Sequence, residues 1–178
     1  MTKLLPGRPI HDRFVMDYPA TPPRRLEGVP VLTSIHVAKA TRLPMRSVER
    51  VTVEAGRGIV GDRYHGTRHR HVTVQSATAL AAATAAYGAE VPAALTRRNL
   101  TVDEGEVPTA PGSRIRVGEV LLEVVRVAAP CKLLDDTIGR GAQEALRRRG
   151  GSVCRVLEGG EIAVGDPVEL EVAAAVDA

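Results

Sequence analysis

Aromatic residues are scarce in this 178-residue chain, which has no tryptophan, one phenylalanine and three tyrosines. Proteins that bind single-stranded nucleic acids stack the bases on aromatic side chains. The net charge of +3 and the isoelectric point near 9.2 favour anionic ligands, but they do not amount to a dense basic surface. We therefore expect no nucleic-acid partner.

Cysteine is equally rare, with two residues, Cys131 and Cys154. Two cysteines do not make the disulfide framework of a small secreted protein. The sequence alone leaves a single Cys131–Cys154 bridge open. Because the start of the chain does not have the pattern of a signal peptide, we expect a cytoplasmic protein in which both thiols are free.

Long apolar runs are also missing. The longest run, residues 120–130, is interrupted by Glu123 and Arg126. It is too short and too charged to cross a bilayer, so we expect no membrane association.

The chain divides into an arm, a domain and a tail. Residues 1–30 hold six of the twelve prolines. Repeated proline removes backbone donors and fixes φ, so this segment predicts an extended arm. We expect a single domain over residues 31–172, followed by a short C-terminal tail over residues 173–178.

Short runs rich in β-branched residues, bounded by turn residues, fill the predicted domain. They predict strands at residues 31–38, 48–53, 71–75, 99–102, 113–117, 120–127, 152–157, 161–164 and 167–172. Many short strands and few helices indicate a mainly β (α+β) fold, either a small barrel or a closed mixed sheet.

Two segments have the pattern of helices. Residues 76–87 are rich in alanine, with Ser76 as the N-cap and Gly88 as the C-terminal stop. Residues 142–149 predict a second helix, in which the arginines at 147–149 complement the helix dipole. Since the dipole accounts for these arginines, we assign them no role in a site.

Cys131 is the most informative single residue. It follows the apolar strand-like segment 120–127, and Pro130 forces a break directly before it. A thiol in this place projects from the end of a strand. Most free cysteines are small buried hydrophobic residues, which is the interpretation that we give Cys154 in its alternating strand.

A glycine-rich loop follows one of the predicted strands. Gly56, Gly58 and Gly61 match the G-x-G-x-x-G pattern of dinucleotide-binding proteins. That site requires a helix directly after the loop and an acidic residue about 20 positions on. The chain runs instead into Asp62-Arg63-Tyr64-His65-Gly66. We exclude a dinucleotide site, and the loop can present Arg63 to an anion.

Three histidines, His65, His69 and His71, lie within seven residues of each other. On a strand, His69 and His71 would share one face, which is conceivable zinc geometry. The same stretch, Arg68-His69-Arg70-His71, could equally bind a phosphate or a pterin tail.

Arg97, Arg98 and Asn99 open a predicted strand. Arginine offers a rigid fork of donors that fits phosphate, and asparagine adds a donor and an acceptor. Taken alone, the same residues are also typical of a solvated strand end.

Together these segments resemble a MOSC domain, the C-terminal module of molybdenum cofactor sulfurases, which also occurs as a stand-alone protein. The similarity extends from about residue 31 to residue 170. The matching pieces, in the family's order, are Gly58-Ile59-Val60-Gly61-Asp62-Arg63-Tyr64-His65-Gly66, Thr96-Arg97-Arg98-Asn99-Leu100, Ala129-Pro130-Cys131, Gly150-Gly151-Ser152-Val153 and Gly159-Gly160-Glu161-Ile162-Ala163-Val164-Gly165-Asp166-Pro167-Val168.

The resemblance implies a closed β-barrel of the pyruvate-kinase type with two or three short helices. It implies binding of the molybdenum cofactor (molybdopterin), with Cys131 as the metal ligand or as a sulfur carrier. A thiolate is a soft ligand that suits such a metal. Arg97 and Asn99 would hold the phosphate and pterin end. Four further residues are candidates for cofactor binding: Arg98, Arg63, Arg70 and His71.

The resemblance also implies partners. Amidoxime-reducing relatives carry an additional N-terminal domain, and sulfurases carry a pyridoxal-phosphate domain that makes persulfide. We find neither here, so we expect an external electron donor or a sulfur-donating desulfurase, together with a small-molecule substrate.

Three functions follow from these expectations. The first is sulfur transfer, or reduction of N-hydroxylated compounds, at a cofactor bound through Cys131. The second is a non-catalytic carrier or chaperone of the cofactor. The third is a zinc-dependent hydrolase that uses His65, His69 and His71.

Overall fold

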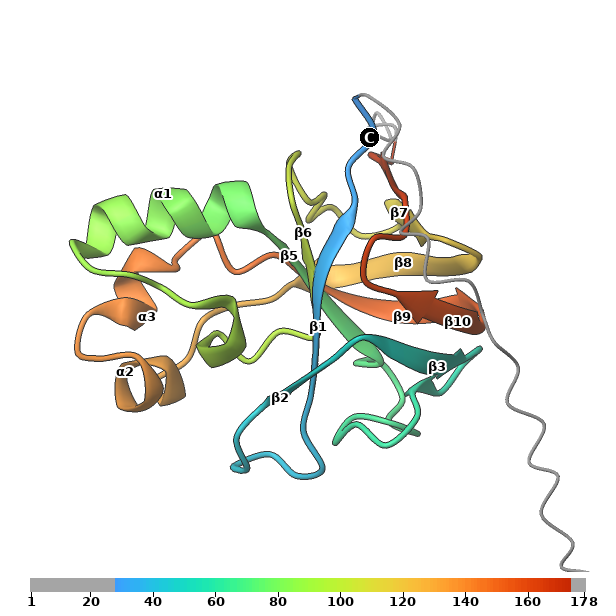
Figure 1. Cartoon of the computed structure of the whole chain (residues 1–178), viewed down its shortest axis with the longest axis horizontal. Coiled ribbons are helices and arrows are strands. Elements are labelled where there is room, and N and C mark those ends of the chain that lie inside the picture. Colours follow the sequence, from blue (N-terminus) through green and yellow to red (C-terminus); the bar gives the residue numbers. More distant parts are fainter. Residues whose placement is uncertain (1–27, 174–178) are drawn as a thin grey trace, which may run out of the picture.

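The computed structural model describes residues 28–173, and the predicted arm lies almost wholly outside this range, as does most of the tail. The described chain is mainly β, with three short α-helices and one 3-10 helix, η1 (Figure 1). In chain order the elements are β1 (Leu32–Val37), β2 (Arg46–Val48), β3 (Arg50–Glu54), β4 (Gly58–Ile59), β5 (Val72–Ser76), α1 (Ala77–Tyr87), η1 (Ala93–Leu95), β6 (Leu100–Val102), β7 (Arg114–Val117), β8 (Val120–Val127), α2 (Leu133–Thr137), α3 (Ala142–Ala145), β9 (Ser152–Glu158), β10 (Gly160–Ala163) and β11 (Val168–Glu171).

The strands form two sheets. The larger has eight strands in the order β11-β7-β8-β9-β5-β6-β1-β2, and the smaller has three in the order β10-β3-β4. All ladders are antiparallel except that between β5 and β6, which is parallel. The parallel pair is possible because α1 makes the crossover between these two strands.

The predicted closed barrel is not what the structure shows, because neither sheet closes on itself through a ladder. The start of β1 meets the start of β11 in one isolated bridge, between Val31 and Pro167. Pro30 and Pro167 lie at this junction, and proline cannot donate a backbone hydrogen bond. Single backbone hydrogen bonds, such as that from Val168 to the carbonyl of Pro30 at 2.7 Å, therefore join the two segments, and no ladder forms between them.

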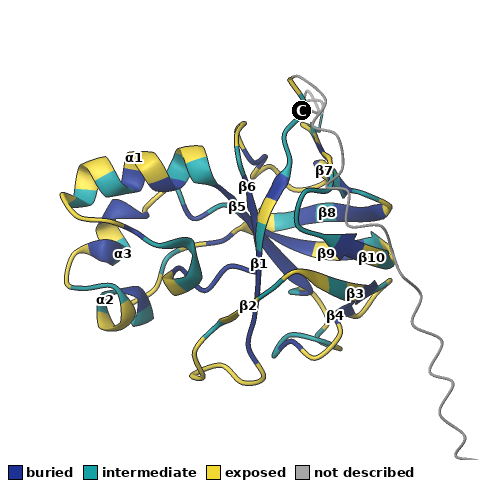
Figure 2. Ribbon diagram, in the orientation of Figure 1, coloured by how far each residue is buried: buried dark blue, intermediate teal, exposed yellow. Residues whose placement is uncertain are grey.

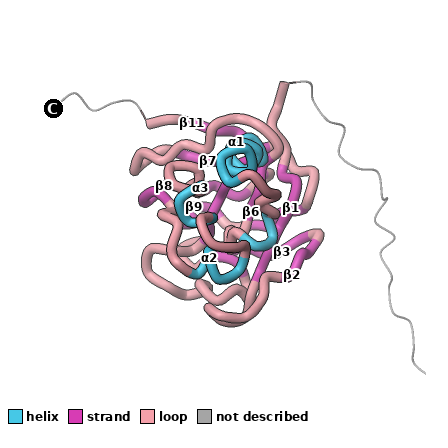
Figure 3. Tube along the Cα trace, turned by 90° about the vertical axis from the view of Figure 1, so that its left-hand side faces the viewer, coloured by secondary structure: helices cyan, strands magenta, loops and turns pink. Residues whose placement is uncertain are grey.

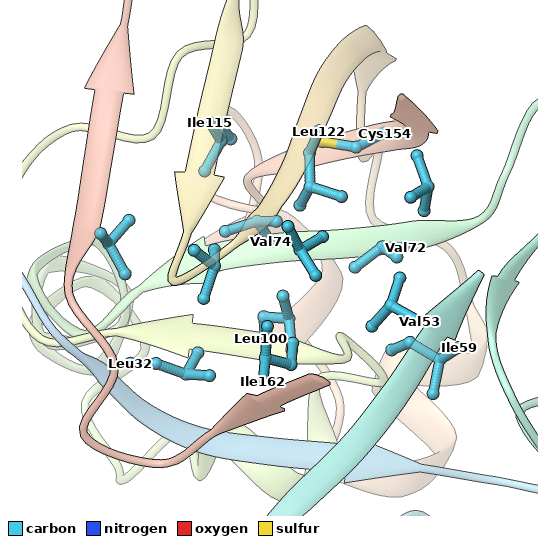
Figure 4. Packing of buried hydrophobic residues seen from close by; sticks show 14 of the residues in the cluster. Leu32, Val53, Ile59, Val72, Val74, Leu100, Ile115, Leu122, Cys154 and Ile162 are labelled. Carbon is cyan, nitrogen blue, oxygen red and sulfur yellow. The ribbon is translucent and has the colours of Figure 1, made fainter. Parts of the chain in front are cut away.

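The hydrophobic core lies between the two sheets and inside the curve of the larger one (Figure 4). Alternate residues of the strands point into it, so buried and exposed positions alternate along several ribbons (Figure 2). Leu100, Leu122 and Val74 are completely buried there. Cys154 belongs to the same cluster, as we expected, and its burial raises the pKa of the thiol to about 12.

The helices gather on one side of the large sheet (Figure 3). Ser76 caps α1 by accepting a hydrogen bond from the backbone amide of Ala79, and Gly88 ends it with φ at 78°, as the sequence predicted. A second hydrophobic cluster holds the three helices together; it includes Leu80, Leu134 and Leu146.

The predicted helix over residues 142–149 is shorter than expected. Helix α3 ends at Ala145, and Arg148 takes a left-handed conformation with φ at 61°. The arginines at 147–149 therefore do not form the last turn of a helix. The helix-dipole interpretation of these residues was wrong.

Candidate functional site

Strands β5, β6 and β1 carry polar residues on the face turned away from the hydrophobic core. Thr73, Asn99 and His36 lie in one row across this face, and all three are buried. Asn99 accepts hydrogen bonds from the backbone amide and the hydroxyl of Thr73, and its Nδ2 donates to the carbonyl of His36 at 3.1 Å. This row is the base on which the charged residues described next are fixed.

Asp62 connects this base to the glycine loop. Its carboxylate accepts hydrogen bonds from the backbone amides of Ala38 and Tyr64 and from the side chains of Asn99 and Arg63, at 3.1 to 3.2 Å. Only 6% of the residue is exposed. One buried carboxylate therefore orders a loop, a strand end and a guanidinium group together.

Arg63, from the same loop, is fixed in turn. Its side chain is 2% exposed, and it donates to the sulfur of Met45 at 2.9 Å and to the carbonyl of Arg97 at 3.0 Å. Arg97 itself has φ at 63°, in the left-handed region that is uncommon for residues other than glycine. Its guanidinium donates to the carbonyls of Thr41 and Leu43. The side chain of Arg97 thus ties the loop between β1 and β2 to the strand end that carries Asn99.

Arg98 points the other way, toward the end of β8. Its guanidinium donates to the carbonyls of Gly150 and Ala128 at 2.8 and 2.7 Å. Burial lowers its pKa to about 10, with a further contribution from the charge of Arg70, so it still carries its charge at neutral pH. Arg98 therefore ties the segment that leads to Cys131 to the sheet.

Arg70 differs from the other three arginines because no described residue accepts a hydrogen bond from it. Its guanidinium stacks over the ring of Tyr64 at 4.0 Å, and that of Arg63 lies 4.6 Å from the same ring. Burial lowers its pKa, Tyr64 and Cys131 raise it, and Arg63 and Arg126 lower it. A half-buried cation with unused donors is suited to an anionic ligand.

Cys131 lies at the edge of this group of arginines. It is free and exposed, and its carbonyl accepts a hydrogen bond from Leu134 at the start of α2. Its charge acts on Arg70, Arg97 and Arg98 and raises the pKa of each, although burial lowers all three more strongly. We call Cys131 together with Arg63, Arg70, Arg97 and Arg98 the thiol–arginine site.

A cavity of about 220 Å³ opens beside the thiol–arginine site. It is bordered by Arg97 and by apolar side chains that include Leu95 and Met45. Leu95 is 40% exposed, which gives the cavity an apolar entrance. A small substrate with an apolar body could be placed here next to the charged groups.

The comparisons with known proteins agree with this geometry. A sequence model of the MOSC domain matches residues 61–169, which is more than half of the chain. The chain belongs to the MOSC domain family. No match to a curated protein sequence was found.

Solved structures with the same fold include three bacterial proteins. The YuaD protein of Bacillus subtilis superposes with a TM-score of 0.71 at 18% identity, over 82% of this chain and 97% of that one. YiiM of Geobacillus stearothermophilus gives 0.63 at 21% identity, over 83% and 77% of the two chains. YiiM of Escherichia coli gives 0.59 at 18% identity, over 83% and 72%. At these identities the likeness concerns the fold.

The MOSC domain places His71 away from the exposed surface of the site. The residue is 3% exposed; its Nδ1 accepts a hydrogen bond from the amide of Val156 at 3.0 Å, and its Nε2 lies 2.8 Å from the carbonyl of Thr67. These two partners require a neutral ring that donates from Nε2. His71 therefore joins the glycine loop to β9.

This arrangement predicts a pH dependence of stability. Burial lowers the pKa of His71, so the unfolded chain binds a proton more readily than the folded one. The contribution of His71 to the free energy of unfolding should be fully present above the ordinary histidine pKa of about 6.5. It should be lost progressively as the pH drops below that value. We expect the urea midpoint to fall less between about pH 7.5 and 5.5 in His71→Asn than in the wild type. If the urea midpoint changed equally with pH in the wild type and in His71→Asn, this role of His71 would be contradicted.

The three histidines proposed for zinc do not come together. His65 pairs with Glu54 at 3.0 Å, His71 is used as above, and His69 is exposed. Within residues 28–173 no group of three histidine, cysteine or acidic side chains could hold a metal ion. Over the same residues no helix has the length and apolar character needed to cross a bilayer.

Three residues near the thiol were missed in the sequence. Asp62 and Tyr64 were noted only as part of the glycine loop, and Arg126 only as a charge in an apolar run. Asp62 bonds Asn99, 37 residues away in the chain, whereas Tyr64 stacks on the nearby Arg70. The signal for Asp62 and Tyr64 was the string of residues directly after the glycine pattern, and Arg126 had no such signal.

Proposed function

We propose that this MOSC domain binds the molybdenum cofactor through the thiolate of Cys131 and serves sulfur transfer or the reduction of N-hydroxylated compounds. The observation that supports this is an exposed thiol whose charge acts on Arg70, Arg97 and Arg98, together with the guanidinium of Arg70, which donates to no described residue. MOSC domains are associated with this cofactor in general. The donor set fits it: a soft thiolate suits the metal, and guanidinium groups suit an anionic phosphate.

The roles that we propose differ among the candidate residues. Arg70 contacts the anionic end of the cofactor, because no described residue accepts a hydrogen bond from its guanidinium. Arg97, Arg98 and Arg63 supply positive charge, while their hydrogen bonds to backbone carbonyls keep them in place. Asn99 supports the site from below, since both ends of its side-chain amide are already bonded inside the sheet.

When bound, the cofactor supplies a metal that can change its oxidation state. In sulfur transfer, the thiolate of Cys131 instead attacks the outer sulfur of a cysteine persulfide on an external desulfurase. A new S–S bond forms at Cys131 while the S–S bond of the donor breaks, and the donor cysteine leaves as a thiolate. In both cases the arginines hold an anion beside the thiol. An external electron donor or sulfur donor completes the system.

The test is cofactor loading. The protein is purified from cells that make the cofactor, and molybdenum content and pterin fluorescence are measured. We expect Cys131→Ser to lower both by at least about tenfold, as loss of a metal contact does. Cys154→Ala, which removes the other thiol from the core, is the matched control and should load normally. Equal loading of the wild type and Cys131→Ser would refute ligation by Cys131.

A second pair of variants tests the anion contact. Arg70→Gln should lower the pterin signal, because it removes the free guanidinium. Arg114→Gln removes the same charge from an exposed position on β7 and should not. If the two variants load alike, Arg70 does not hold the anion.

A non-catalytic carrier of the cofactor is the second candidate. The exposure of Cys131 favours it, because a site open to water suits the delivery of a cofactor. A carrier should bind without turnover even when a reductase and an N-hydroxylated substrate are supplied. Turnover that depends on Cys131 would eliminate the carrier and support the enzyme.

A further inference from the structure

A second cavity lies apart from the thiol–arginine site and shares no residue with it. Its volume is about 470 Å³, within the range of small-molecule sites. It is formed where the start of α1, the loop after β6 and the segment before β9 meet. It is lined by Ser76, Thr78, Ala79, Ala82, Gly105, Glu106, Val107, Thr109, Arg148, Arg149 and Gly151.

Two adjacent arginines give one wall of this cavity its positive charge. The guanidinium of Arg149 donates one hydrogen bond to a described residue, to the carbonyl of Ala145 at 3.0 Å. Arg148 has no hydrogen bond or ion pair with any described residue. Arg147, the third of the series, does not line the cavity and pairs with Glu144 at 3.4 Å. Between Arg147 and Arg149 the backbone is left-handed, with φ of Arg148 at 61°.

Hydroxyl groups line the same cavity. Thr78 in the first turn of α1 and Thr109 in the loop are both exposed toward solvent. The first turn of an 11-residue helix adds backbone amides that have no acceptor within the helix, and this turn contains no acidic residue. Guanidinium groups, hydroxyls and amides are all donors to an oxyanion.

The remaining lining is apolar apart from Glu106 and Ser76, whose hydroxyl caps α1. Ala79, Ala82 and Val107 provide small hydrophobic surfaces that can contact a carbon skeleton. Glu106 is the single acidic residue of the lining, so the charge of the two arginines is offset only in part. The cavity therefore combines a cationic, donor-rich end with a compact apolar surface.

We infer that this cavity binds the phosphate monoester of a small organic molecule. The phosphoryl group lies against Arg148, Arg149 and the threonine hydroxyls, and the carbon body lies on the alanines of α1. The guanidinium, hydroxyl and amide groups together offer more hydrogen-bond donors than the two oxygens of a carboxylate can accept. A phosphate monoester, which has three terminal oxygens, uses them better. The site is independent of the molybdenum cofactor.

The test is an NMR titration of the ¹⁵N-labelled full chain with phenyl phosphate at low ionic strength, with benzoate as the competing chemistry. We expect saturable shifts at the amides of Thr78, Thr109 and Arg148. Benzoate should bind at least about tenfold more weakly, as expected when charged hydrogen bonds are lost. Equal binding of benzoate would overturn the phosphate assignment, and the absence of saturable shifts would overturn the site.

Two pairs of variants make the result specific. Arg148→Ser should weaken phenyl phosphate about tenfold. Arg147→Ser, which removes the same charge one position away, should leave binding within about twofold. Ala82→Leu should block the cavity, whereas Ala81→Leu, on an exposed part of α1 outside the lining, should not. Equal effects within either pair would show that net charge or helix stability, and not the cavity, governs binding.

The same titration on Cys131→Ser separates this inference from the proposed function. Binding should be unchanged in that variant, because none of the lining residues belongs to the thiol–arginine site. A loss of binding would mean that the two sites are one, which would overturn the inference. Far-UV circular dichroism confirms that each variant is folded.

Discussion

Asp62→Asn is expected to lower the free energy of unfolding by about 3 kcal/mol or more, the range found when a buried charged partner is removed. In the wild type, one carboxylate oxygen accepts from Ala38, Asn99 and Arg63. An asparagine of the same size would turn either its amide nitrogen or its carbonyl oxygen toward these three donors. In the first case donors face donors, and in the second the buried guanidinium loses its negative partner.

Urea unfolding followed by circular dichroism measures this effect. Asp136→Asn is the matched control, because Asp136 is exposed on α2 and its side chain makes no hydrogen bond with a described residue. The control should change stability by less than about 0.5 kcal/mol. Since Asp62 also positions Arg63, we further expect Asp62→Asn to load less cofactor at temperatures where it is still folded. A change in stability no larger than that of the control would show that Asp62 does not organise the site.

The elements that could be predicted from the sequence are those decided by local chemistry. Strand β8 occupies residues 120–127 as expected, because a run of valine and leucine, interrupted only by Glu123 and Arg126, favours a strand. Helix α1 begins after Ser76 and ends at Gly88 because both caps act on their own helix. Where the partners are local, pattern and structure agree.

The elements that could not be predicted depend on distant partners. We expected one strand over residues 48–53, but the chain divides at Glu49. Strand β2 pairs with β1 in the large sheet, whereas β3 pairs with β10 in the small one. Nothing in a run of alternating residues says that its two halves belong to different sheets.

The same distinction holds for the candidate site. The exposure of Cys131 could be anticipated, because Pro130 ends the strand directly before it. The partners of Arg97, Arg98 and Asn99 could not, because they lie between 26 and 63 residues away, apart from the contact of Arg98 with Thr96. Residues chosen as donors to a ligand prove to be donors to the protein's own carbonyls. Arg70 was a weaker candidate and is the one whose guanidinium donates to no residue in the described part of the chain.

The two glycines before β9 show how the sheet controls the position of the thiol. The carbonyl of Gly150 accepts a hydrogen bond from Nε of Arg98, and the carbonyl of Gly151 accepts one from the amide of Ala128 at 2.8 Å. Ala128 precedes Cys131 by three residues. Any displacement of these glycines therefore moves both an arginine of the site and the segment that carries the thiol.

Gly151→Ala is accordingly expected to be the most destabilising glycine-to-alanine substitution in the described chain. We expect it to lower the free energy of unfolding by on the order of 4 kcal/mol, from backbone strain and overpacking combined. Gly151 has φ at 72°, and a Cβ there would overlap the carbonyl oxygen of Val74 and lie 2.9 Å from the Cα of Gln75. These are backbone atoms of β5, in the middle of the large sheet, so they cannot move aside as a flexible side chain would.

Gly112→Ala provides the control that separates strain from collision. Gly112 also has a positive φ, 86°, but no atom lies within 4 Å of the position of its Cβ. This variant should lose only about 1 kcal/mol, the cost of the left-handed backbone. The difference between the two variants in urea midpoint therefore measures the contact with β5. If that contact fixes the thiol, Gly151→Ala should also lose cofactor loading under conditions where Gly112→Ala keeps it, and equal behaviour of the two would show that the junction before β9 does not hold the site in place.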